Sequence, residues 1–256
     1  MNILITGGAN GIGKRTALKL VQRGHNVKVI DTDKDALKDL DQEIETFHGD
    51  VREKEDLQEA TRRFEVEVLI NSAGYQKQGS VEDMEIDNFR EHIETNYLGT
   101  VNAVKTCLTS IRRSKGRVIN MSSVAGKTGL RYLSAYCGSK HAVEGFSDSL
   151  RMELKDSEVK VVIVEPGPIK TGFNEQGRDH LRNFVPGSRY SDEYSKKLDS
   201  PVEGVKTEKA AEKVVKAVEA EKPKTRYTVT KEAFFVRKLK RFFPDRLWDK
   251  LMVSQQ

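Results

Sequence analysis

The sequence predicts one α/β domain, built on a doubly wound parallel sheet with helices on both faces. Short β-rich runs alternate with helical stretches through the first two-thirds of the chain, which is typical of strand–helix–strand units. A glycine-rich loop joins the first strand to the first helix, and an acidic residue ends the second strand. A chain of 256 residues can bury a sizeable core, and no repeat, low-complexity block or flexible linker divides it. We therefore expect a single domain over residues 1–256.

The amino-terminal segment predicts a strand, a helix and a second strand in succession. The apolar run Ile3 to Ile5 forms the first strand, which ends at Thr6. The helix ends at Gly24 and carries an apolar stripe at helical spacing, made of Ile12, Ala17, Leu18, Leu20 and Val21. A second strand through Val27, Val29 and Ile30 then finishes at Asp31.

The loop Thr6-Gly7-Gly8-Ala9-Asn10-Gly11-Ile12-Gly13 is predicted to hold phosphate groups. Its glycines let the backbone turn tightly, and a helix that begins at Ile12 directs its amides and its dipole at an anion. A simple turn is one alternative. A nucleotide-triphosphate loop is disfavoured, because Arg15 stands where a Ser or Thr hydroxyl would hold magnesium.

Asp31 favours NAD over NADP as the nucleotide. A carboxylate at the end of the second strand can accept hydrogen bonds from the adenosine ribose, and it repels a phosphate on that ribose. Neither Asn10 nor Thr32 offers a compensating cation. The alternative is that Asp31 only forms a turn or caps the helix that starts near Lys34.

Later strands are predicted at Val66 to Asn71, Val118 to Met121 and Val159 to Val164. The second of these delivers Ser122 and Ser123 to the carboxyl edge of the sheet, where open parallel sheets bind ligands. A serine hydroxyl there could donate to a substrate carbonyl oxygen as negative charge builds on it. Ordinary loop polarity would also explain the two serines.

Tyr136 and Lys140 are separated by one helical turn, so both side chains lie on the same face of the predicted helix. A lysine ammonium beside a phenol favours the phenolate, so we expect the pKa of Tyr136 to fall towards the working range. Tyr227 and Lys231 repeat the spacing, but their β-branched surroundings predict a strand, in which the two residues lie farther apart. Tyr136 is therefore the predicted general acid/base.

Other chemistries receive little support from the composition. The two cysteines, Cys107 and Cys137, form no metal or disulfide pattern, and the five histidines lack ligand spacing, so no metal site is expected. The chain enters its first strand directly after Met1 and has no apolar run of membrane-spanning length, so we expect a cytoplasmic protein.

Residues 231–256 form a predicted amphipathic tail that is rich in both basic and aromatic side chains, and Pro244 divides it. We expect the aromatics to cover the substrate pocket or a subunit contact, with the cations in solvent. Attachment to a membrane surface is the less favoured alternative, and nucleic-acid binding is not expected.

These segments resemble the short-chain dehydrogenase/reductase superfamily from Asn2 to about Thr171. The first loop has that family's Thr-Gly-x-x-x-Gly-x-Gly form, and Asn71-Ser72-Ala73-Gly74 is similar to its Asn-Asn-Ala-Gly element, with Ser72 as a departure. The segment Glu165-Pro166-Gly167-Pro168-Ile169-Lys170-Thr171 is similar to its Pro-Gly element. Because independent segments match in the right order, the resemblance is specific.

The resemblance implies a Rossmann-like sheet of about seven strands and an NAD(P)-dependent oxidoreductase. The enzyme would interconvert an alcohol and a ketone or aldehyde by hydride transfer. Tyr136 would exchange a proton with the substrate oxygen, and Ser123, selected over Ser122 by the family's spacing, would hold that oxygen. Lys140 would lower the pKa of the tyrosine and bind the nicotinamide ribose. Asn96, which on its own could cap, kink or face solvent, would hold a water that links Lys140 to solvent.

The resemblance also implies the residues around NAD, with NADP as the less favoured cofactor. Gly7, Gly11, Ile12 and Gly13 would lie at the pyrophosphate, Asp50 and Val51 at the adenine, and Ile169 and Thr171 at the carboxamide. The full predicted set is Gly7, Asn10, Gly11, Ile12, Gly13, Asp31, Asp50, Val51, Asn71, Ala73, Gly74, Tyr136, Lys140, Pro166, Gly167, Ile169 and Thr171. Helices through Asn96 and Tyr136 would form homodimer or homotetramer contacts.

Substrate identity is the least determined part of the prediction. The polar segment 172–201 is predicted to be a substrate lid. A loose similarity to 17β-hydroxysteroid and retinol dehydrogenases implies a bulky apolar small molecule. A non-catalytic NAD-sensing regulator and an NAD-dependent sugar epimerase or dehydratase remain alternatives, although the latter has a Gly-x-x-Gly-x-x-Gly loop that Gly7, Gly11 and Gly13 do not fit.

Overall fold

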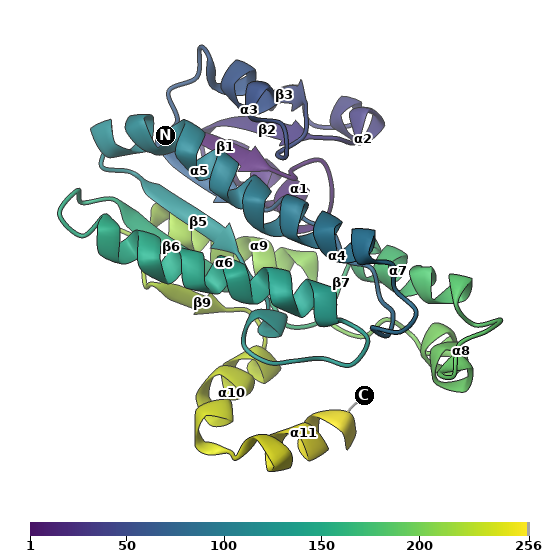
Figure 1. Cartoon of the computed structure of the whole chain (residues 1–256). Coiled ribbons are helices and arrows are strands. Elements are labelled where there is room, and N and C mark those ends of the chain that lie inside the picture. Colours follow the sequence, from purple (N-terminus) through teal and green to yellow (C-terminus); the bar gives the residue numbers. More distant parts are fainter. Residues whose placement is uncertain (255–256) are drawn as a thin grey trace.

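The protein, whose residues 1–254 are described here from a computed structural model, is a single α/β domain with a seven-stranded parallel sheet (Figure 1). The strand order is β3-β2-β1-β4-β5-β6-β9, and every neighbouring pair is parallel. The strands are β1 (Asn2–Thr6), β2 (Asn26–Asp31), β3 (Glu45–His48), β4 (Val68–Asn71), β5 (Arg117–Met121), β6 (Lys160–Glu165) and β9 (Arg226–Thr228). The predicted fold class is confirmed.

Helices cover both faces of this sheet. The long helices are α1 (Gly11–Val21), α5 (Gly99–Arg113), α6 (Ser134–Glu153) and α9 (Thr207–Glu219). Shorter segments are α2 (Lys34–Lys38), α3 (Lys54–Thr61), α4 (Ile86–His92), the π-helix η1 (Ile93–Leu98) and the 3₁₀ turn η2 (Val124–Gly126). In Figure 1, α5 and α6 lie in front of the sheet and α9 lies behind it.

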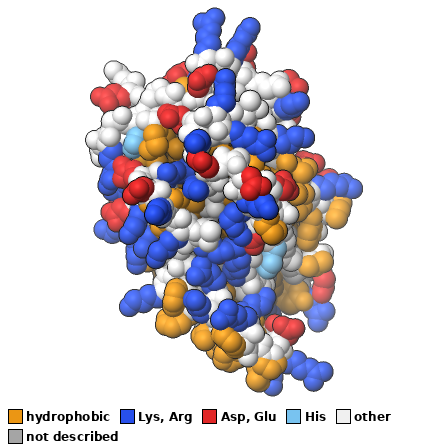
Figure 2. All heavy atoms as spheres, turned by 90° about the vertical axis from the view of Figure 1, so that its left-hand side faces the viewer, with side chains coloured by type: hydrophobic (Ala, Val, Ile, Leu, Met, Phe, Trp, Pro, Cys, Tyr) orange, Lys and Arg blue, Asp and Glu red, His pale blue; other side chains and the backbone are white. Residues whose placement is uncertain are grey.

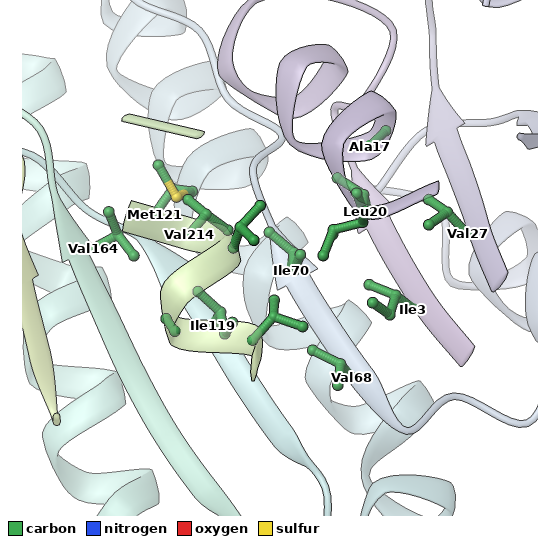
Figure 3. Close-up of a cluster of buried hydrophobic side chains, with 14 of the residues drawn as sticks. Ile3, Ala17, Leu20, Val27, Val68, Ile70, Ile119, Met121, Val164 and Val214 are labelled. Carbon is green, nitrogen blue, oxygen red and sulfur yellow. The ribbon is translucent and has the colours of Figure 1, made fainter. Parts of the chain in front are cut away.

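The alternating direction of side chains along each strand explains why apolar clusters form on both faces of the sheet. Ile3 and Ile5 lie on one face of β1, with Leu4 on the other, because successive side chains of a strand point to opposite faces. The first face packs against α1 and α9 through residues such as Leu20 and Val214 (Figure 3). The second face packs against α3, α5 and α6. Both faces are therefore buried, as a doubly wound parallel sheet requires.

Close backbone contacts fix the loop between β1 and α1. A Cβ at Gly13 would lie 2.2 Å from the carbonyl oxygen of Gly7, and a Cβ at Gly7 would lie 2.5 Å from the Cα of Ala73. Gly7 also has a φ of +66°, which favours glycine. The turn that brings α1 against the sheet therefore depends on these two glycines.

The segments beyond β6 differ in part from the sequence expectations. Residues 172–201 form α7 (Gly172–Asp179), the 3₁₀ turn η3 (His180–Asn183) and α8 (Ser191–Asp199), beside a short pair of strands, β7 (Ile169–Lys170) and β8 (Val205–Lys206). Tyr227 lies in β9, but Lys231 already begins a helix, so the strand predicted there is shorter than expected.

The carboxyl-terminal segment divides at Pro244, as predicted. It consists of α10 (Lys231–Leu239), the 3₁₀ turn η4 (Lys240–Phe242) and α11 (Asp245–Ser254). Residues 255 and 256 of the predicted tail lie outside the described residues. Within residues 1–254, none of the helices has both the length and the apolar content that a bilayer-crossing segment needs.

We predict that Gly13→Ala lowers the free energy of unfolding by about 2–3 kcal/mol, because the added methyl group overlaps the Gly7 carbonyl. Gly145→Ala, within α6, is the control, since a Cβ there meets nothing within 4 Å. It should stabilise the protein by about 0.5–1 kcal/mol. Urea unfolding of both variants tests this, and equal stabilities would contradict the proposed packing of the loop.

Candidate active site

A cleft of about 1250 Å³ runs along the carboxyl ends of the strands and extends beneath α7 and α8. It brings together residues that are far apart in the sequence. Almost every predicted site residue lines it, namely Gly7, Asn10, Gly11, Ile12, Gly13, Asp31, Asp50, Val51, Ala73, Gly74, Ser123, Tyr136, Lys140, Pro166, Gly167, Ile169 and Thr171. Asn71 and Asn96 do not line the cleft.

The amino terminus of α1 is suited to an anion. Asn10 occupies the cap position without a side-chain hydrogen bond to the helix, and the first turn contains no acidic residue. The Asn10 Nδ2 instead donates to Asp33 Oδ2 at 2.9 Å. Gly11 has a φ of +53°, and a Cβ there would meet only a Thr171 methyl, at 3.9 Å. The uncapped amides and the open space beside Gly11 fit the pyrophosphate of a dinucleotide.

The far end of the cleft, next to β2, is acidic. Asp31 accepts hydrogen bonds from the backbone N–H groups of Ala9, at 2.9 Å, and of Asp33, at 3.0 Å. Asp33, rather than Asp31, caps α2 by accepting from Ala36. Arg52, which also lines the cleft, is paired through its Nη2 with Asp50 at 2.6 Å. The carboxylate of Asp31 is therefore held by backbone N–H groups at the wall of the cleft.

Tyr136 lies at the centre of the cleft on the first turns of α6. It is buried, and its phenol hydrogen-bonds with Ser123, which follows β5. Ser123 also accepts from the Ala125 N–H at 3.1 Å, so its hydroxyl is oriented by η2. Of the two adjacent serines, Ser123 is therefore the one that contacts the tyrosine.

Lys140 is buried beneath Tyr136, and its Nζ donates to the Met121 carbonyl at 3.0 Å. The Nζ lies 5.7 Å from the centre of the Tyr136 ring. Burial lowers the pKa of Lys140 to about 8, and Glu144, one turn further along α6, opposes this shift.

The expected fall of the Tyr136 pKa does not occur in this structure, where burial has the larger effect. Burial raises the pKa of Tyr136, and only the hydrogen bond with Ser123 acts in the opposite direction. The sequence argument considered the charge of the lysine but not the removal of both groups from water, which disfavours their charged forms. In this structure both side chains are therefore shifted towards their neutral forms.

Asn96 is fully buried in the π-helix η1, and both polar atoms of its side chain have protein partners. Its Oδ1 accepts from the Tyr75 N–H at 2.9 Å, and its Nδ2 donates to the Tyr75 carbonyl and to Ser139 Oγ, each at 3.0 Å. Ser139 Oγ in turn donates to the Tyr136 carbonyl at 2.8 Å. Asn96 thus positions both the loop after β4 and the turn of α6 that carries the tyrosine.

Asn71, predicted to bind cofactor, links two strands in this structure. Its Nδ2 donates to Asn120 Oδ1 at 2.8 Å, and Asn120 Nδ2 donates to Ser147 Oγ on α6 at 2.8 Å. The last residue of a parallel strand can bond its neighbour across the sheet as easily as it can face the cleft. This chain of hydrogen bonds from Asn71 through Asn120 to Ser147 links β4, β5 and α6.

The substrate end of the cleft has two kinds of lining. Leu130, Leu133 and Phe173 pack around Tyr136, with the Phe173 ring centre 6.0 Å from that of the tyrosine. Beyond them lie Lys197 and Arg178, from the segment predicted as a lid.

Lys197 is half-buried in this wall, and burial together with the nearby guanidiniums of Arg131 and Arg178 lowers its pKa. Its Nζ lies 5.7 Å from the centre of the Tyr132 ring. Arg178 donates to the carbonyls of Lys197 and Ser200, while its Nε is buried without a partner. The sequence analysis did not single out these cations, because only the packing of α7 and α8 turns them towards the cleft.

A partly buried charge cluster packs against α6 outside the cleft. Arg226 of β9 contacts Glu144, Asp148 and Glu165, and Lys127 pairs with Glu144 at 2.7 Å. Burial, and then the nearby Glu144, raise the pKa of Glu165. These residues come from four separate segments, so the sequence offered no local sign that they meet.

Other expectations concern metals and thiols. In the part of the chain that the structure describes, no group of His, Cys, Asp and Glu side chains could hold a metal ion. Cys107 and Cys137 are free and buried, and burial raises the pKa of the Cys107 thiol to about 12. The described residues therefore provide no reactive thiol in the cleft.

A doubly wound sheet with an uncapped glycine-loop helix and a Tyr–Lys pair at its carboxyl edge defines the class of dinucleotide-dependent oxidoreductases. Residues 1–182 match the family model described as short chain dehydrogenase. The chain belongs to this family, the short-chain dehydrogenases/reductases, so the predicted family is confirmed.

Relatives cover nearly the whole chain. A probable short-chain type dehydrogenase/reductase, VdlC, of Helicobacter pylori is 30% identical over 97% of this chain and 95% of its own length. An NADPH-dependent 3-dehydrocapnine reductase of Ornithobacterium rhinotracheale is 32% identical over 97% of this chain and 94% of its own. The fold also matches a short chain dehydrogenase from Burkholderia cenocepacia in complex with NADP, with a TM-score of 0.80 at 22% identity, over 98% of this chain and 96% of the other.

We predict that Lys140→Met stabilises the protein by about 2 kcal/mol at pH 7. The variant no longer buries a charged ammonium, whose pKa is about 8 in the folded state against an ordinary value of 10.5. The hydrogen bond to the Met121 carbonyl is lost with the ammonium, and this loss reduces the gain in stability. Below pH 8 the lysine is protonated in both states, so the cost is fully present. Between pH 8 and 10.5 only the unfolded state keeps the proton, so the gain should shrink.

Urea unfolding at pH 7 and at pH 10 measures this difference. A Lys140→Met variant that is less stable than the parent at pH 7 would contradict the inferred cost of the buried charge.

Proposed function

We propose that this protein is an NAD-dependent oxidoreductase that interconverts an alcohol and a ketone or aldehyde, with Tyr136 as the general acid/base. The observation that carries the proposal is the convergence of Tyr136, Ser123 and Lys140 in one cleft with the uncapped start of α1. When bound, the nicotinamide supplies or accepts the hydride. The remaining chemistry is proton transfer and orientation by side chains of this chain.

In carbonyl reduction, the Tyr136 hydroxyl would donate its proton to the substrate oxygen, and Ser123 would hold that oxygen by a hydrogen bond. A raised pKa keeps the phenol protonated throughout the neutral range, which suits a proton donor. Lys140, charged below about pH 8, would stabilise the phenolate left behind. In alcohol oxidation the Tyr136 phenolate would accept the proton of the substrate hydroxyl, so this direction would become faster as the pH rises.

The charges at the adenosine end support NAD as the preferred cofactor. Asp31, Asp33 and Asp50 line this end, and the one guanidinium among them, that of Arg52, is already paired with Asp50. A ribose phosphate would therefore meet net negative charge. The names of some relatives mention NADP or NADPH, so this preference needs a direct test.

The substrate end supports a molecule with an apolar body and an anionic group. Leu130, Leu133 and Phe173 would contact the apolar part beside the reacting carbon. Lys197 has no carboxylate partner within 4.0 Å among residues 1–254, and it would pair with the anionic group. This refines the bulky apolar substrate that the sequence suggested.

Tyr136→Phe should reduce kcat by about 10³-fold or more while NAD affinity stays within about twofold, because only the transferable proton is lost. Tyr227→Phe is the matched control, since its hydroxyl accepts from the Lys224 N–H, outside the cleft. It should retain activity. Steady-state kinetics and calorimetric NAD titration make the comparison, and similar activity losses in both variants would remove Tyr136 as the proton donor.

Asp31→Asn should shift the ratio of kcat/KM for NAD to that for NADP about tenfold or more towards NADP. The amide oxygen of Asn can still accept from the Ala9 N–H, and the variant removes the charge at the cost of the hydrogen bond from the Asp33 N–H. An unchanged ratio would mean that Asp31 only orders the loop. Both cofactors are measured by the absorbance of the reduced nicotinamide.

Lys197→Gln should raise KM about tenfold for a secondary hydroxy acid and leave KM unchanged for its uncharged amide. Lys209→Gln is the control, because Lys209 is exposed on α9 and does not line the cleft. If both substrates respond equally to the Lys197 change, or if the Lys209 change has the same effect, the anionic group is not recognised by Lys197.

A further inference from the structure

The segment Lys231–Val253, here called the C-terminal arm, packs against the domain by its inner side only. Thr230 caps α10 by accepting from the Ala233 N–H at 3.2 Å, and Ala233 is buried. On α11, Trp248 is buried and its Nε1 donates to Thr128 Oγ1 at 2.7 Å. Arg237 reaches Glu165 at 3.7 Å. These contacts set the orientation of both helices.

The outer side of the arm is apolar and open to solvent. Phe235 is 55% exposed, Phe242 68% and Leu247 55%. More than half of the exposed large hydrophobic side chains in residues 1–254 belong to this short arm. Figure 2 shows these hydrophobic side chains gathered at the lower end of the molecule, where Figure 1 places α10 and α11. Isolated exposed hydrophobic residues are normal, but a concentrated group marks an interaction surface.

Cations surround this apolar face. The exposed basic residues of the arm are Lys231, Lys238, Arg241, Arg246 and Lys250, against Glu232, Asp245 and Asp249. The guanidinium of Arg241 lies 4.5 Å from the centre of the Phe242 ring, so charge and apolar surface are adjacent. The arm therefore offers apolar side chains with a positive border.

The arm does not cover the cleft. Within the described part of the chain, none of its residues lines the cleft, whose wall is formed instead by α7, α8 and the loop before α6. Of the two roles predicted for these aromatics, cover of the substrate pocket is therefore wrong, and a subunit contact stays a prediction. The outward-facing Phe235, Phe242 and Leu247 are open to solvent, so this face is available to another molecule.

We propose that the C-terminal arm binds the surface of an anionic lipid bilayer, with α10 and α11 lying in the plane of the interface. Phe235, Phe242 and Leu247 would enter the boundary between headgroups and acyl chains, and the neighbouring cations would contact lipid phosphates. A second copy of the chain fits less well. Two arms related by a two-fold axis would bring their own cations together, whereas anionic headgroups neutralise them.

Vesicle co-sedimentation of the full-length protein tests the proposal. We expect binding to vesicles of phosphatidylglycerol and phosphatidylcholine at a ratio of about 3:7, and much weaker binding to phosphatidylcholine alone. The double change Phe235→Ser and Phe242→Ser should lower the partition coefficient at least about tenfold. The double change Val81→Ser and Ile86→Ser is the matched control, because it removes exposed hydrophobic side chains, 67% and 61% accessible, from elsewhere on the surface.

The double change Lys238→Gln and Arg241→Gln should weaken binding to the anionic vesicles about fivefold for each cation removed. Added salt should also weaken this binding. Matched thermal unfolding of all variants checks that the fold is retained. Equal sedimentation of the arm variants and the control pair would overturn the proposal. So would a parent protein that does not bind the anionic vesicles. A parent dimer that dissociates on Phe235→Ser, measured by analytical ultracentrifugation, would assign the face to a second copy instead.

Discussion

The burial of the Lys140 ammonium against the Met121 carbonyl is the interaction on which the candidate site depends. It fastens the first half of α6 to the end of β5, and these two elements carry Tyr136 and Ser123. The Asn96–Ser139–Tyr136 chain of hydrogen bonds fastens the same turn of α6 to the π-helix from the other side. The tyrosine is thus held between two buried polar contacts, neither of which uses its hydroxyl, and the phenol contacts Ser123 at the cleft.

This arrangement has an energetic consequence. A lysine in a dry site destabilises the fold while it is charged, and a phenol in the same site holds its proton more tightly. Both shifts arise from burial, and the two groups lie on one face of one helix. Functional sites commonly retain such unfavourable groups because the chemistry needs them. The surrounding network of Glu144, Arg226 and Glu165 adds rigidity to α6 without entering the cleft.

Local periodicity was sufficient to predict much of the fold. The β1–α1–β2 unit, the later buried strands and the helical turn between Tyr136 and Lys140 all follow from spacing along the chain. The features that the sequence did not predict depend on tertiary packing. Asn71 pairs with Asn120 across the sheet, an interaction that depends on strand register, and the pKa directions of Tyr136 and Lys140 depend on burial. The polar edge strand β3 has no buried alternation, and the wall containing Lys197 exists only because α7 and α8 fold over the cleft.

The most direct test of the central claim is the formation of reduced nicotinamide by the purified protein, followed by absorbance. The alcohols would be a panel of secondary alcohols from short chains to sterols, including hydroxy acids, with NAD and NADP compared in parallel. The account predicts turnover with NAD, fastest for an alcohol that has both an apolar body and an acidic group. Tight NAD binding without turnover of any alcohol or of the corresponding ketones would contradict it, and would indicate a protein that binds the dinucleotide without catalysis.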